Sequence, residues 1–140
     1  VSVKEYNARA DAEEVLREGM VSMGRRGDAC GFIAESTIDW ASFGSPFDHK
    51  FDNGQLRSIG GYCNIGSELG WYCDKNGKEV LAPFKNYRCV YKATGNKRYM
   101  QKYWGVEMKA EGDTLTLYTN MLGANLDQRV PTLLDELLAD

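Results

Sequence analysis

The feature that most constrains the fold is a period-two alternation of side chains between positions 85 and 121. The first run alternates from Tyr87 to Tyr91, and runs over 100–108 and 114–121 continue the pattern. Alternation in segments rich in Tyr, Val, Thr and Trp is typical of strands with one buried face. The sequence therefore predicts three consecutive strands.

Two short turn sequences separate these runs, at 94–96 (Thr-Gly-Asn) and 111–113 (Glu-Gly-Asp). Gly and Asn tolerate the positive φ that tight hairpins require. We therefore expect a C-terminal antiparallel meander over 85–121, with one face toward the core and one toward water.

Helices are predicted at both ends of the chain. Apolar side chains recur at helical spacing over the first 24 residues, which predicts an amphipathic N-terminal helix. Pro131 suits the first turn of a short C-terminal helix that carries a stripe of leucines. Such a helix must pack against the apolar face of the sheet or against a partner protein.

Two runs in the middle, 56–65 and 68–73, are interpreted as further strands. Their glycines imply bulges or close backbone approach. The segment 31–41 fits a short helix or a strand. The whole predicts a single α+β domain over 1–140, with an antiparallel sheet of five to six strands.

The chain has four cysteines, no C-x-x-C pair and one histidine, so a structural zinc site is not expected. An even number of cysteines in a small chain predicts two disulfides and an oxidising compartment. Buried free thiols in a cytosolic protein are the alternative. Spacing leaves three connectivities open. The cysteines are Cys30, Cys63, Cys73 and Cys89.

Several classes of function find no support in the sequence. No apolar run approaches the eighteen or so residues of a membrane span. No serine has a G-x-S-x-G setting, and neither a P-loop nor a dinucleotide fingerprint occurs. We expect no cofactor, no metal and no catalytic residue.

Positive charge is concentrated in the predicted meander. Between 85 and 109 there are seven basic residues and one acid, although the whole chain carries a net charge of −3. This indicates contact with an acidic protein or an anionic membrane surface, while nucleic acid is disfavoured by the acidic total. A solvated sheet face is the alternative. The candidate contact residues are Arg88, Lys92, Lys97, Arg98, Tyr99, Lys102 and Tyr103, with Leu133, Leu134 and Leu137 in the tail.

The order of features from the first helix through Gly27-Asp28 to Asp39-Trp40 resembles the opening of the nuclear-transport-factor-2-like and polyketide-cyclase-like cone folds. The resemblance covers about the first 40 residues. It implies a curved antiparallel sheet around a small apolar molecule, with an Asp or His as the general base of a lyase or isomerase. On that reading the catalytic candidates are Asp39, Asp48 and His49.

The function predicted from these features is non-enzymatic. We expect a small soluble accessory or interaction subunit of a larger assembly, secreted or in an organelle lumen such as that of a thylakoid. Its partner would be a protein, and a membrane-associated complex is one setting. The alternatives are the cone-shaped small-molecule binder and a secreted effector-like protein.

Overall fold

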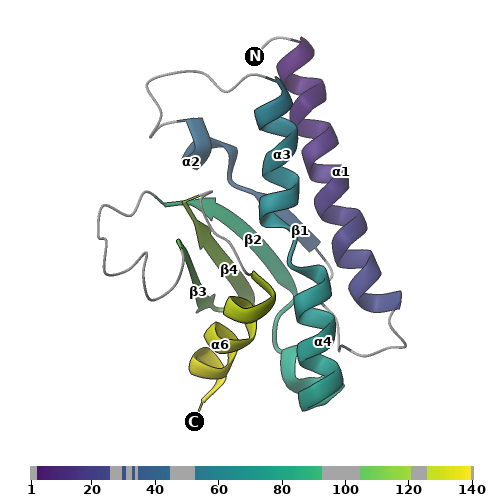
Figure 1. Ribbon diagram of the computed structural model, residues 1–140, viewed down its shortest axis with the longest axis vertical. Coiled ribbons are helices and arrows are strands. Elements are labelled where there is room, and N and C mark those ends of the chain that lie inside the picture. The colour runs from purple at the N-terminus through teal and green to yellow at the C-terminus, as the bar shows by residue number, and fades with distance from the viewer. Residues whose placement is uncertain are drawn as a thin grey trace.

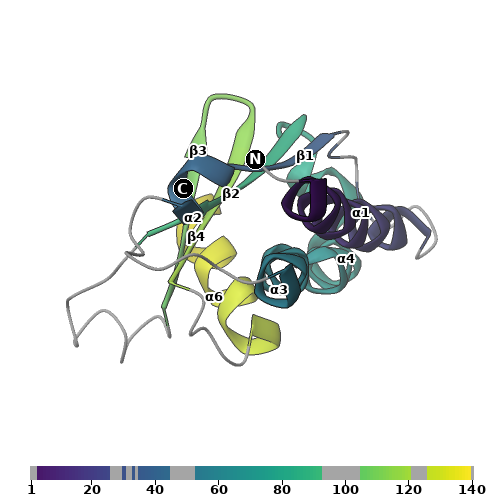
Figure 2. The ribbon, with the colours of Figure 1, turned by 90° about the horizontal axis from the view of Figure 1, so that it is seen from above.

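The computed structural model describes residues 3–25, 30, 33, 35–44, 53–92, 105–120 and 126–139. They form an α+β fold in which a four-stranded sheet carries α1, α3, α4 and α6 on one side (Figures 1 and 2). The predicted α+β class, N-terminal helix and C-terminal helix are confirmed.

The sheet is mixed, with strand order β1-β2-β4-β3. β1 pairs with β2 and β2 pairs with β4, both in parallel, whereas β3 pairs with β4 in antiparallel. The strands are β1 Glu35–Ile38, β2 Asn86–Tyr91, β3 Val106–Glu111 and β4 Thr114–Thr119.

The predicted meander is therefore wrong in its pairing. β4 lies between β2 and β3, and the first and last strands of the segment are parallel neighbours. Alternation shows which side chains share a face, but it does not choose the neighbouring strand or its direction. The hairpin predicted at 111–113 is confirmed, with Gly112 at φ 65°. The turn at 94–96 lies outside the described residues.

The strand count of five to six is also wrong, because the central segments are helical. The helices are α1 Val3–Arg25, α2 Trp40–Gly44, α3 Asn53–Cys63, α4 Gly66–Asn76 and α6 Leu126–Leu138, with a 3₁₀ turn at Lys78–Leu81. The segments 56–65 and 68–73 fall in α3 and α4. Pro131 lies inside α6 rather than in its first turn.

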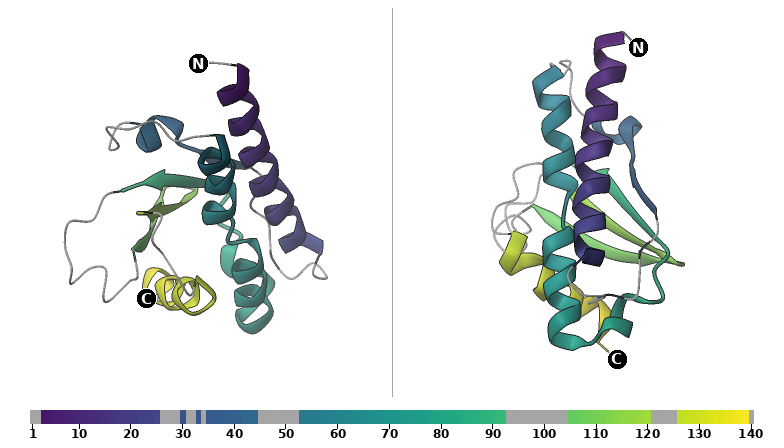
Figure 3. Two further views of the ribbon diagram at one scale, coloured as in Figure 1. Left: turned by 45° about the horizontal axis from the view of Figure 1, so that its top comes forward. Right: turned by 90° about the vertical axis from the view of Figure 1, so that its right-hand side faces the viewer.

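Close packing along α1 explains two of the glycines in these helices, Gly60 and Gly66 (Figure 3). A Cβ added at Gly60 would lie 2.3 Å from the carbonyl oxygen of Ala12, and one at Gly66 would lie 2.0 Å from that of Gly19. The close backbone approach that the glycines imply is real, but it joins helices rather than strands. Glycine is required at positions 60 and 66 because a side chain there would push α3 or α4 away from α1.

Two disulfides join the helices to the rest of the fold, as predicted. Cys63 at the end of α3 is bonded to Cys89 in β2, with Cα atoms 5.8 Å apart. Cys30 is bonded to Cys73 in α4, with Cα atoms 5.2 Å apart. No described helix is long and apolar enough to span a bilayer.

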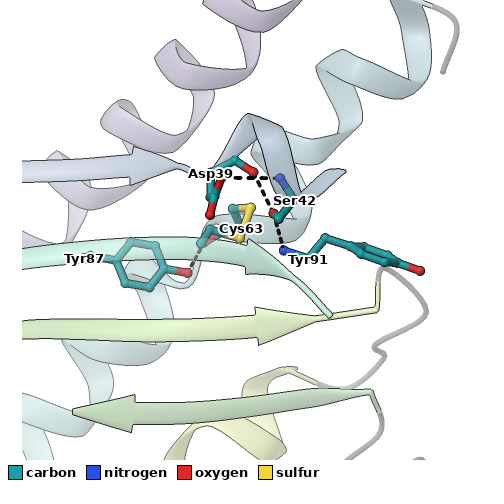
Figure 4. Close-up of a disulfide and its surroundings, with 6 residues drawn as sticks. Asp39, Ser42, Cys63, Tyr87 and Tyr91 are labelled. Atoms are coloured by element: carbon teal, nitrogen blue, oxygen red, sulfur yellow. Dashed lines mark hydrogen bonds between the residues drawn. A yellow bond between two sulfur atoms is a disulfide. The ribbon is translucent and has the colours of Figure 1, made fainter. Parts of the chain in front are cut away.

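The core lies between the sheet and the helices. Tyr87 and Cys89 of β2, together with Leu115 and Leu117 of β4, point to the helical side and are fully buried. The Tyr87 hydroxyl donates a 2.6 Å hydrogen bond to the carbonyl oxygen of Cys63, beside the disulfide (Figure 4). Burial raises the pKa of Tyr87 well above its usual value.

Candidate interaction surface

Alternation along four paired strands produces a second sheet face, opposite the helices, which we call the open face. The register places Thr37, Arg88, Thr116 and Lys109 side by side in one row across the sheet. Polar side chains dominate this face because every second residue of each strand must point away from the buried core. The described helices α1, α3, α4 and α6 lie on the other side of the sheet and leave the open face uncovered (Figure 2).

Tyr118 of β4 lies on this face between Val90 of β2 and Glu107 of β3. The Nζ atoms of Lys92 and Lys109 each lie 5.5 Å from the centroid of its ring, within the range of a cation–π contact. Glu107 bridges the same two lysines, at 3.1 Å from Lys92 and 3.6 Å from Lys109. The lysine side chains remain about half exposed, at 47% and 50%. Tyr118 therefore presents an aromatic surface flanked by two accessible cations.

Glu111 fixes the other end of the Tyr118 ring. The Tyr118 hydroxyl donates a 2.9 Å hydrogen bond to Oε1 of Glu111. The nearby Thr116 hydroxyl and the hydrogen bond from Tyr118 lower the pKa of Glu111. Burial, followed by the bond to Glu111, raises the pKa of Tyr118. Tyr118 is accordingly a neutral hydrogen-bond donor at neutral pH, held in one orientation.

Asp39 and Arg88 form a second polar group on the same face. Nη2 of Arg88 lies 2.6 Å from Oδ2 of Asp39. Oδ1 of Asp39 accepts a hydrogen bond from the backbone N–H of Ser42 and so caps α2. The Ser42 hydroxyl donates to the Asp39 carbonyl oxygen and accepts from the backbone N–H of Tyr91 (Figure 4). Both carboxylate oxygens of Asp39 are engaged in holding the fold together.

The described part of the open face is balanced in charge rather than basic. The three described cations on this face each lie beside a carboxylate, so the described part of the face carries no excess of positive charge. The described cations are Arg88, Lys92 and Lys109, and the carboxylates beside them are Glu35, Asp39, Glu107 and Glu111. Lys97, Arg98, Tyr99, Lys102 and Tyr103 lie outside the described residues, as do Asp48 and His49.

The leucine stripe of the C-terminal helix packs within the chain itself. Leu133 and Leu134 are buried in the core, and Leu137 is half-buried against it. α6 contacts β3 and α4, and the Tyr72 hydroxyl of α4 donates a 2.9 Å hydrogen bond to Asp135. Of the two packing partners that the sequence allowed, the protein's own core covers this helix.

The open face includes residues that sequence reasoning did not select. Tyr118, Glu107 and Glu111 were missed because no local pattern links them. The signal that could have found them is the strand register, which sets Tyr118 opposite Glu107 and places Lys109 beside Thr116. Among the described residues no group of acidic, histidine or cysteine side chains could hold a metal ion.

The resemblance to the cone folds is not supported by the sheet. It implies an antiparallel sheet, whereas two of the three observed pairings are parallel. Comparison of the chain with family models, with curated proteins and with solved structures found no match.

Proposed function

We propose that this protein is a non-enzymatic interaction subunit of an assembly in an oxidising compartment, and that it binds a partner protein through the open face. The two disulfides support the compartment, because structural disulfides persist where thiols are not kept reduced. A secreted protein and a protein of an organelle lumen both meet this condition.

The observation that carries the proposal is the arrangement around Tyr118. Protein interfaces are enriched in aromatic residues, and a few of these supply most of the binding energy. Tyr118 is held by Glu111 on one side and flanked by Lys92 and Lys109, so little side-chain entropy is lost when a partner covers it. The described helices leave this face uncovered.

The alternation of charges favours a protein over a polyanion as the partner. Arg88 and Asp39 lie side by side, as do Lys109 and Glu107. A phosphate backbone or an anionic membrane would meet carboxylates between the cations, which weakens attraction by bulk charge. A protein surface with charges in the complementary order could match each pair and would gain specificity from the match.

The test is quantitative affinity purification with cross-linking from an extract of the native compartment, comparing three forms of the protein. One carries Tyr118→Ser together with Lys92→Glu, which leaves β3 unchanged. The matched control carries Lys4→Glu on α1, an exposed site on the helical side. Loss of one interface aromatic corresponds to about 2 kcal/mol, or roughly thirtyfold in affinity. We expect the face variant to lose a specific partner that the wild type and the Lys4 control recover equally.

Circular dichroism must show that all three forms are folded. Recovery of the same partner by the face variant at wild-type yield would refute the proposal.

A further inference from the structure

The outer edge of β3 carries backbone groups that point away from its one neighbour in the sheet, β4. The backbone N–H of Asn120 donates a 2.9 Å hydrogen bond to the carbonyl of Gly105. Hydrogen-bonded and non-hydrogen-bonded pairs alternate in an antiparallel ladder. The register therefore directs the backbone groups of Glu107, Lys109 and Glu111 toward β4, and those of Val106, Met108 and Ala110 away from it.

The two edges of the sheet differ in length. β1 forms one edge, is only four residues long and packs beside α1. β3 forms the other, packs beside α6, is six residues long and contains no proline. Edges of this length are normally blunted by bulges, prolines or unpaired charges, because they pair readily with other strands. Lys109 is a charge of this kind and would discourage pairing with another strand. It would no longer do so if the second strand placed a carboxylate opposite it.

We propose that β3 pairs in antiparallel with β3 of a second copy of this chain, about a two-fold axis through Met108. The charges on β3 select this register. Glu107 then faces the partner's Lys109, and Lys109 faces the partner's Glu107. These are non-hydrogen-bonded positions, where cross-strand side chains approach most closely.

The neighbouring register is disfavoured by the same charges. An axis through Lys109 sets two lysines opposite each other and sets Glu107 opposite the partner's Glu111, so all facing charges repel. An axis through Ala110 restores attraction between Lys109 and the partner's Glu111, but it leaves Val106, Glu107 and Met108 beyond the end of the facing strand. Only the Met108 axis pairs five of the six strand residues, Val106–Ala110, and sets opposite charges against each other.

The edge groups suit this pairing in a second way. Val106, Met108 and Ala110 are the residues with outward backbone groups, and the Met108 axis pairs them with one another. About six main-chain hydrogen bonds result, and the two sheets become one continuous sheet. This interface uses the edge of β3 and does not depend on the open face binding a partner.

The test is sedimentation velocity on the purified chain over a concentration series. Wild type should form a dimer as concentration rises. Lys109→Glu and Glu107→Lys should each weaken self-association about tenfold or more, because the two-fold axis applies every change twice. An equimolar mixture of the two variants should dimerise again, since each facing pair then joins opposite charges. The Lys4→Glu control should behave as wild type, and circular dichroism should show that each variant is folded.

Two further measurements identify β3 as the strand that pairs and determine the register of the pairing. Ala110→Pro removes an outward N–H without removing a β3–β4 hydrogen bond, and it should abolish the dimer while preserving the fold. Carbodiimide treatment of a ¹⁴N/¹⁵N mixture should give isotopically mixed cross-links between Glu107 and Lys109. A wild type that stays monomeric at millimolar concentration, or a variant mixture that fails to dimerise, would overturn the proposal.

Discussion

Replacing Gly60 with alanine should destabilise the protein, whereas the same replacement at the adjacent Gly61 should stabilise it. Both residues lie in α3, so the gain in helix propensity is the same at the two positions. Their surroundings differ. A Cβ at Gly60 would lie 2.3 Å from the carbonyl oxygen of Ala12 and 2.9 Å from its carbonyl carbon, whereas a Cβ at Gly61 has no heavy atom within 4 Å.

The magnitudes follow from two opposing effects. Alanine gains about 1 kcal/mol over glycine in a helix interior. Overpacking costs about 1–3 kcal/mol, and the upper end applies at Gly60 because the obstacle is backbone, which cannot rotate away. Gly60→Ala should therefore lower the free energy of unfolding by about 2 kcal/mol, and Gly61→Ala should raise it by about 1 kcal/mol.

Chemical denaturation and thermal melting followed by circular dichroism measure both changes. For a chain of 140 residues, about 4 °C in Tm accompanies each kcal/mol. We expect a fall of about 8 °C for Gly60→Ala and a rise of about 4 °C for Gly61→Ala. Equal stabilisation by both substitutions would show that α1 and α3 are not in backbone contact, and the account of the helical layer given above would be wrong.

Two other predictions concern the disulfides and a buried tyrosine. Replacing Cys63 and Cys89 by alanine should lower the free energy of unfolding by about 3.5 kcal/mol, because the disulfide closes a loop of 26 residues in the unfolded chain. Urea denaturation of the oxidised wild type and of the double variant measures the difference. Burial raises the pKa of Tyr72 to about 12, with the hydrogen bond to Asp135 as the second cause. Folding therefore favours the neutral phenol. Its contribution to the free energy of unfolding is complete below pH 10 and is lost as the pH rises from 10 through 12. Tyr72→Phe should lower the free energy of unfolding by about 1 kcal/mol at pH 8, because the hydrogen bond to Asp135 is lost. It should also make the decline in stability above pH 10 shallower, and urea denaturation from pH 8 to pH 12 measures both effects. An unchanged pH profile would contradict the role given to Tyr72.

The two terminal helices were predictable because their patterns are local. Ala8, Ala12, Leu16 and Met20 recur at helical spacing and are all buried in α1. The faces of the strands were predictable for the same reason, since Tyr87 and Cys89 alternate with Arg88 and are buried as the period-two pattern requires. Periodicity is a property of a few consecutive residues, and the structure preserves it.

Strand order depends on contacts that no local pattern records. The meander follows from assuming that consecutive strands are neighbours, but β4 inserts between β2 and β3. The same non-local pairing determines the open face. Asp39 reaches Arg88 from a position 49 residues earlier in the chain, so a cation of the basic run is paired with a carboxylate that the local sequence does not contain.

The helices α3 and α4 show most clearly how tertiary contacts override propensity. Glycine disfavours a helix by about 1 kcal/mol per residue, and Gly60, Gly61 and Gly70 all lie within these two segments. Contact with α1 requires glycine at Gly60, and the disulfides tether α3 at Cys63 and α4 at Cys73. Each cross-link lowers the conformational entropy of the unfolded chain and so stabilises the folded state by about 3.5–4 kcal/mol. This exceeds the helix-propensity cost of the three glycines together. It follows that these segments are helical because the rest of the fold holds them. Reduction of both disulfides should therefore weaken α3 and α4 before it weakens α1, whose helical pattern is encoded locally.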